Sequence, residues 1–188
     1  YPLQSNCCKI YVHKWLRIFI SLPSKSNSCY NRIGQIKEGE HNMKIQSVAI
    51  LGAGAVGSYI IWGLSKKDNI RLGVIAEGDR VRRLKESGCA INGAVYRPEV
   101  WTPQEAQGVD LLVVALKYGS LPGALESIKT AVGSNTVVMS LMNGVDSEEL
   151  IAAQVGAEHL LYSFIKVTSH KEADGYHFDP DATLGVIY

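Results

Sequence analysis

The chain has few cysteines, and their positions exclude the two usual roles of a cysteine-rich sequence. Four of the 188 residues are cysteine, and none forms a Cys-x-x-Cys pair. Three lie within the first thirty residues, and the fourth is Cys89. This spacing matches neither a disulfide framework nor a zinc site. We expect Cys89 to be a free thiol in a cytoplasmic protein.

The sequence also lacks a strong charge of either sign. Its formal net charge is +1, so no overall field attracts it to nucleic acid or to acidic lipid. The densest basic group is Arg80, Arg82, Arg83 and Lys85, which is too small for the basic face that DNA binding requires. We expect no nucleic-acid partner.

Long apolar runs, metal-binding patterns and nucleophile motifs are absent as well. The apolar run of residues 15–22 is too short to span a bilayer, so we expect no membrane partner. None of the five histidines stands at a metal-binding spacing from another ligand. No nucleophile elbow or Ser-His-Asp order is present. We expect no metal.

The first 42 residues differ in character from the rest. The first methionine is Met43, and regular hydrophobic patterning begins only after it. We expect residues 1–42 to be a leader upstream of the natural start, disordered or weakly helical, and residues 43–188 to form one domain. The chain stops at Tyr188 inside an apolar run, which predicts that this domain is truncated.

Strands and helices are predicted to alternate from residue 46 onward. Short apolar runs predict strands, and apolar residues at helical spacing predict the helices between them. The predicted strands are 46–51, 72–76, 111–116 and 136–141, and the predicted helices are 56–67, 79–86, 122–132 and one capped by Asp146 with Glu149 three residues on. This order predicts an α/β fold with a Rossmann-like, doubly wound, mostly parallel sheet.

Two further segments predict additional strands. Asn92-Gly93 lies between two short β-prone runs within residues 89–96 and predicts a hairpin. In the tail, residues 160–169, 176–178 and 183–188 are expected to be strands joined by Gly and Asp-Pro turns.

A glycine-rich motif follows the first predicted strand and opens the first helix. It reads Gly52-Ala53-Gly54-Ala55-Val56-Gly57. Gly52 permits a tight turn, Gly54 lets the backbone approach a pyrophosphate, and Gly57 allows close packing of helix on strand. The start of the helix offers free N–H groups to the phosphates. The motif in this context predicts a dinucleotide-binding site, and residues 43–188 an NAD(P)-binding domain.

The end of the second predicted strand carries charges that bear on which dinucleotide binds. Glu77 lies 20 residues after Gly57, where an acid can accept hydrogen bonds from the ribose and repel a 2′-phosphate. Arg80, Arg82 and Arg83 follow and could pair with such a phosphate. All four charges could equally belong to a solvated helix face. Spacing alone leaves the choice between NAD and NADP open.

Two polar residues follow two later strands. Lys117 comes just after the strand of residues 111–116, and Asn143 comes after that of residues 136–141. Ligands of open α/β sheets bind at the carboxyl ends of strands, so both residues are candidates for substrate or cofactor contact. Asn143 could instead only provide a turn before the helix.

Three segments together resemble the ketopantoate reductase (2-dehydropantoate 2-reductase) family. They are residues 48–57, residues 114–118 with Lys117, and residues 141–150 with Asn143. The resemblance implies a Rossmann-like domain followed by a helical domain, which this chain lacks. It also implies NADPH-dependent reduction of a small 2-keto acid, 2-dehydropantoate, to pantoate in pantothenate and coenzyme A synthesis.

The resemblance further assigns site residues. Lys117 matches the family lysine near nicotinamide and substrate, and Asn143 matches the asparagine that contacts both. The family's general acid is a lysine of the helical domain, so no residue of this chain takes that role. Family members that favour NADPH often carry arginine where this chain has Glu77, with Arg80 as the expected compensating residue.

Two alternatives stay open. Glu77 motivates an NADH-dependent reductase of another 2-keto acid. A nucleotide-sensing Rossmann domain without chemistry would need the glycine motif but neither Lys117 nor Asn143. The sequence makes no prediction about oligomeric state.

Overall fold

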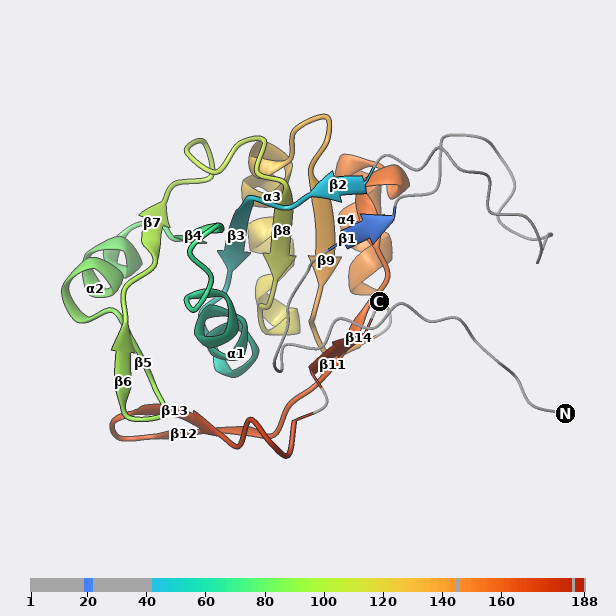
Figure 1. The fold of residues 1–188 in the computed structure, drawn as a ribbon. Coiled ribbons are helices and arrows are strands. Elements are labelled where there is room, and N and C mark those ends of the chain that lie inside the picture. The colour runs from blue at the N-terminus through green and yellow to red at the C-terminus, as the bar shows by residue number, and fades with distance from the viewer. Residues whose placement is uncertain (1–18, 22–41, 145, 184, 188) are drawn as a thin grey trace, which may run out of the picture.

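The centre of the molecule is a six-stranded parallel sheet. A computed structural model describes residues 19–21, 42–144, 146–183 and 185–187. The sheet has the strand order β10-β9-β8-β3-β4-β7, and every neighbouring pair is parallel (Figure 1). Its strands are β3 (Ser47–Leu51), β4 (Arg71–Ile75), β7 (Glu99–Trp101), β8 (Leu111–Val114), β9 (Val137–Ser140) and β10 (Leu160–Leu161). In chain order this is 3-2-1-4-5-6, so the doubly wound prediction is confirmed.

Helices cover both faces of this sheet. They are α1 (Ala55–Leu64), α2 (Asp79–Ser87), α3 (Leu125–Ala131) and α4 (Ser147–Val155), with short 3₁₀ turns η1 (Tyr118–Ser120), η2 (Pro122–Ala124) and η3 (Ala157–His159). In Figure 1, α1 lies in front of the sheet, and α3 and α4 lie behind it. Each face therefore has its own hydrophobic core.

Alternate residues of each strand enter the two cores. In β3, Val48 and Ile50 pack on the face of α1, whereas Ala49 and Leu51 pack on the face of α3 and α4. All four side chains are buried. Because both faces are covered, the strands are continuous apolar runs rather than alternating ones.

A second, smaller sheet lies beside α1. Its strand order is β12-β13-β5-β6, built from β5 (Cys89–Ile91), β6 (Ala94–Tyr96), β12 (Ser169–Glu172) and β13 (Gly175–Phe178). The predicted hairpin at Asn92-Gly93 is confirmed, with φ of 49° and 75° at these residues. Cys89 is a free, buried thiol, as expected, and burial raises its pKa.

The predicted tail strand of residues 160–169 is wrong as a single element. Residues 160–161 extend the main sheet as β10, and the chain then leaves it. Residues 164–166 form β11, which pairs with β14 (Gly185–Ile187), and Ser169 begins β12. The segment thus joins three sheets in succession, which a local β-propensity pattern does not reveal.

Three predicted boundaries also shift. The first helix ends at Leu64, three residues before its predicted end, and the strand of residues 111–116 ends at Val114. The predicted helix of residues 122–132 divides into η2 and α3. After β8, a backbone bond from Ala115 to Leu51 O continues the ladder for one residue before the chain turns away into η1.

A short part of residues 1–42, which were expected to be disordered or weakly helical, forms a strand that pairs with the start of the domain. Strand β1 (Phe19–Ser21) lies antiparallel to β2 (Asn42–Lys44). The remainder of residues 1–41 lies outside the described residues, so the prediction for this segment stays a prediction. Within the described part of the chain, no helix has both the length and the apolar character needed to cross a bilayer.

Candidate functional site

The chain reverses its winding direction between β3 and β8. After β3 it turns to α1 on one face, and after β8 it turns to α3 on the other. The register pairs Leu51 with Val114, so the segments that follow both strands begin side by side. A crevice at the carboxyl ends of such strands is where doubly wound folds bind ligands.

Gly52 and Gly57 hold the turn after β3 in close backbone contact. Gly52 has φ of +108°, and a Cβ there would lie 2.6 Å from the carbonyl oxygen of Ala115. A Cβ on Gly57 would overlap the carbonyl oxygen of Gly52. Both positions therefore require glycine, one for the turn beside β8 and the other for packing α1 against the turn.

Gly54 has a different reason to be glycine. Its φ of −83° and ψ of −159° suit any residue, and a Cβ there would meet no atom within 4 Å. The first bond of α1 runs from Ser58 N to Gly54 O at 2.8 Å. The amides of residues 55–57 therefore have no partner within the helix. Free amides beside an open backbone surface form a cradle that fits a phosphate group.

Lys117 and Asn143 lie on the loops that follow β8 and β9, and both are exposed. Lys117 precedes η1 in an extended conformation, and its carbonyl accepts a bond from Ser120 N at 2.8 Å. Asn143 is followed by Gly144, whose φ is +120°. Because β8 and β9 are neighbours, the two loops leave the same edge of the sheet.

A hydrogen bond that the sequence analysis missed joins these two loops. Tyr118 Oη donates to Asp146 Oδ2 at 2.5 Å. This bond, and secondly desolvation, raises the pKa of the Tyr118 phenol. Asp146 is the N-cap residue of α4, as predicted, but the expected side-chain cap is wrong, because the carboxylate binds Tyr118 and makes no capping bond. No local sequence signal joins the two residues, because they are 28 positions apart.

Two buried hydroxyl groups join the two ends of the loop that carries Asn143. Ser140 Oγ of β9 lies 2.8 Å from Ser147 Oγ of α4, and Ser147 Oγ donates to Glu148 Oε2 at 2.7 Å. Ser140 and Ser147 are both buried. The loop with Asn143 is therefore fixed to the core where it begins and where it ends.

Glu77 lies two residues past β4, on the opposite side of β3 from Lys117. Its Oε2 accepts a hydrogen bond of 3.0 Å from Ser127 Oγ of α3. Arg80 lies in the first turn of α2 and is exposed. Glu77 is therefore in contact with α3, the helix that follows β8.

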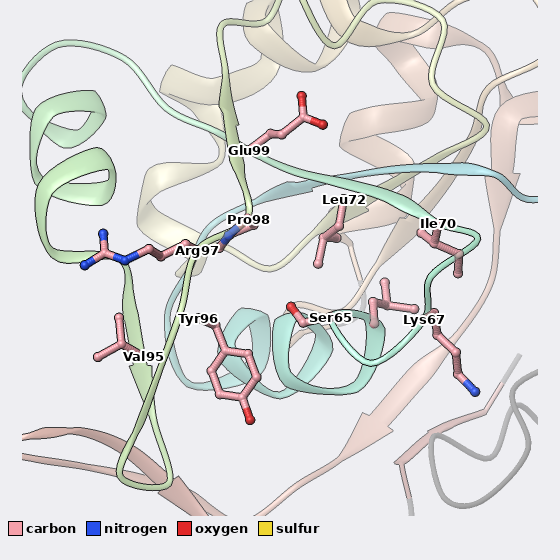
Figure 2. A pocket seen from close by; sticks show the side chains of 10 residues that line it. Ser65, Lys67, Ile70, Leu72, Val95, Tyr96, Arg97, Pro98 and Glu99 are labelled. Carbon is pink, nitrogen blue, oxygen red and sulfur yellow. The ribbon is translucent and has the colours of Figure 1, made fainter.

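A cavity of about 410 Å³ lies away from this edge, between the end of α1 and the segment from β6 to β7 (Figure 2). Leu72 and Glu99, near the starts of β4 and β7, line it, so it lies at the amino ends of these strands. The charged ends of Lys67 and Arg97 point away from it in Figure 2. Arg97 Nη1 instead donates to the carbonyls of Lys85 and Glu86. Neither of these two cations is therefore placed to bind a ligand in the cavity.

Three residues of the β12–β13 hairpin bring possible metal ligands together, although their spacing predicted none. Ligand atoms of Glu172, Asp174 and His177 lie within 4.8 Å of one another. His177 Nε2 lies 2.8 Å from Asp174 Oδ1, and this bond lowers the pKa of Asp174. Both carboxylates are exposed at the hairpin end, far along the chain from the glycine motif.

The sequence is similar to those of known proteins. The family model described as ketopantoate reductase PanE/ApbA matches residues 48–183. The 2-dehydropantoate 2-reductase of Streptococcus pyogenes is 30% identical over 132 residues, which are 68% of this chain and 43% of that protein. The uncharacterized oxidoreductase YkpB of Bacillus subtilis is 28% identical over 116 residues. The chain thus spans less than half the length of these relatives.

Solved structures share the fold. The 2-dehydropantoate 2-reductase of Geobacter metallireducens superposes with a TM-score of 0.61 at 24% identity, covering 70% of this chain and 46% of that one. D-mandelate dehydrogenase in complex with NADH superposes with a TM-score of 0.60 at 26% identity, covering 71% and 44%. The family match, which covers more than half of the chain, shows that the chain belongs to the ketopantoate reductase family of oxidoreductases.

Proposed function

We propose that this chain is the cofactor-binding half of a reductase that converts 2-dehydropantoate to pantoate. The observation that carries the proposal is the convergence of three features at one edge of the sheet: the open cradle at Gly54, Lys117 after β8 and Asn143 after β9. A nucleotide sensor needs the first feature but not the other two. The family match supports the same reaction.

Each residue has a distinct task in this proposal. The free amides of residues 55–57 hold the pyrophosphate, because they start α1 without acceptors of their own. The Lys117 ammonium draws the carboxylate of the 2-keto acid towards the crevice, and the Asn143 amide orients the carbonyl group. A nicotinamide dinucleotide held by the amides of residues 55–57 would supply the hydride for reduction of that carbonyl. The proton donor is expected outside residues 1–188.

For the cofactor we propose NADH. The family resemblance alone implies NADPH. The Glu77 carboxylate is fixed by Ser127 at the end of β4, where it can accept a bond from a ribose hydroxyl and repels a 2′-phosphate. Arg80 is exposed in the first turn of α2, which begins two residues after Glu77.

The cradle is tested by Gly54→Ala in the 188-residue chain. The added methyl group meets no protein atom, so the fold should persist while the path of the pyrophosphate is obstructed. We expect NADH to bind at least 10-fold more weakly, as measured by nicotinamide fluorescence. Gly123→Ala, also in open space, is the matched control and should bind normally. Equal affinity of the two variants would contradict this placement of the dinucleotide.

The reaction is tested in a chimera that joins this chain to the remainder of the Streptococcus pyogenes relative. We expect oxidation of the dinucleotide that depends on 2-dehydropantoate. Lys117→Ala and Asn143→Ala should each lower kcat/KM about 100-fold, as expected when one positioned donor is lost. The 188-residue chain alone should bind dinucleotide without turnover. A chimera that binds dinucleotide without turnover would favour a sensor.

A further inference from the structure

Near the carboxyl end of β4, a hydrogen bond joins two segments that are far apart in the sequence. Glu77 follows β4, whereas Ser127 lies on α3, which follows β8. These strands flank β3 on either side, so the two residues approach the carboxyl end of β3 from opposite directions. Ser127 Oγ donates to Glu77 Oε2 at 3.0 Å across a separation of 50 residues.

This bond restricts a side chain that would otherwise be free to move. Glu77 is exposed, and an exposed glutamate samples several rotamers. Ser127 is half-buried on α3, and the next residue, Ile128, is fully buried in the core. The hydroxyl is therefore held by a helix that is fixed to the core. Only Oε2 of Glu77 is engaged by a residue that the structure describes. The other oxygen, Oε1, is left to accept a bond from a ligand.

We propose that Ser127 is a positioning residue for dinucleotide selectivity, acting by holding Glu77 towards the adenosine ribose. The inference rests on the proposed dinucleotide site. With Glu77 held, the free 2′-hydroxyl of NADH donates to Oε1, whereas the phosphate of NADPH meets a fixed negative charge. Without Ser127, Glu77 can turn away, so NADH loses an ordered acceptor and NADPH meets less repulsion.

The test is direct binding of NADH and NADPH to the 188-residue chain, measured by nicotinamide fluorescence for Ser127→Ala and Ser127→Thr. We expect Ser127→Ala to weaken NADH binding about 5-fold, within the range for loss of one hydrogen bond, without weakening NADPH binding. Ser127→Thr keeps the hydroxyl and should restore the ratio. Thr130→Ala is the matched control on α3, because Thr130 Oγ1 binds Glu126 O and not Glu77.

A double-mutant cycle shows whether Ser127 acts through Glu77. In a Glu77→Gln background, Ser127→Ala should change the affinity ratio less than it does in the wild-type chain. Equal weakening of both dinucleotides by Ser127→Ala would indicate a merely structural role and overturn the inference. An unchanged ratio would also overturn it, while leaving the dinucleotide site intact. Failure of the wild-type chain to bind either dinucleotide would overturn the proposed function itself.

Discussion

Gly57 is the glycine of the motif with the least tolerance for a side chain. Its missing Cβ leaves room for the carbonyl oxygen of Gly52, so alanine would push α1 away from the turn after β3. We expect Gly57→Ala to lower the free energy of unfolding by about 1–3 kcal/mol, the usual cost of overpacking. Urea denaturation measures this loss. The control Gly119→Ala, in open space, should cost far less, and equal losses would contradict the packing argument.

Tyr118 gives a pH-dependent signature of the bond between the loops after β8 and β9. The phenol donates to Asp146, and its pKa is raised mainly by that bond. Since the folded pKa exceeds the unfolded value, the stabilising effect is complete below about pH 10 and is lost as pH rises through the folded pKa. We expect the phenolate absorbance difference between wild type and Tyr118→Phe to titrate above pH ~10. A difference curve centred at or below that value would contradict the bond.

Residues whose role depends on local backbone were predictable, whereas those defined by distant partners were not. The glycine motif predicts the turn directly, because Gly52 and Gly57 lie within one strand-turn-helix unit. Ser127 meets Glu77 over 50 positions, and Tyr118 meets Asp146 over 28. No local pattern marks such pairs. For the same reason the sequence predicted a capping bond from the Asp146 side chain, whose actual partner, Tyr118, lies 28 positions away.

At the scale of elements, Asn92 fastens the β5–β6 hairpin to β13. Its side-chain amide donates to Phe178 O at 3.1 Å and accepts from Phe178 N at 3.0 Å. The ring of Phe178 packs edge-on against Tyr59 and Trp62 of α1, with centroids 5.1 and 5.4 Å apart. The amide therefore helps to hold the small sheet on the helix that begins at the glycine motif.

This clamp predicts an ordered series of stabilities. Asn92→Gly keeps the left-handed turn but removes both bonds, and we expect a loss of about 1–3 kcal/mol. Asn92→Asp keeps the acceptor for Phe178 N and should lose less. Urea denaturation of both variants provides the comparison. If the glycine variant were as stable as wild type, the left-handed turn would be sufficient for stability, and the contribution of the two side-chain bonds would be contradicted.

The strands of the main sheet were predicted more accurately from the sequence than the strands of the tail. Strands buried on both faces must be apolar throughout, so β3 and β8 are recognisable as runs. The tail strands are partly exposed and pair with distant segments, as Tyr176 of β13 does with Ile91 of β5. Their ends depend on partners far along the chain. Local residue preference therefore cannot divide residues 160–178 correctly.

At the scale of the whole molecule, the two cores share one sheet but serve different parts of the site. The core beneath α1 supports the glycine motif. The core beneath α3 and α4 supports α3, which carries Ser127, and the loop after β9, which carries Asn143. Because the sheet separates them, side chains of β3 and β8 contribute to both. A ligand across the carboxyl edge would therefore contact structures anchored in each core.

The described cores also predict which part of the chain the domain needs. Their most N-terminal buried member is Ile45, and β1 pairs with β2 at three positions. A chain beginning at Met43 should therefore keep its thermal unfolding midpoint within about 2–4 °C, the shift that 1 kcal/mol causes in a domain of this size. Circular dichroism measures the midpoint, and nicotinamide fluorescence should give the same NADH affinity. A larger fall would show that residues 1–42 stabilise the domain and would contradict the prediction that they lie outside the fold.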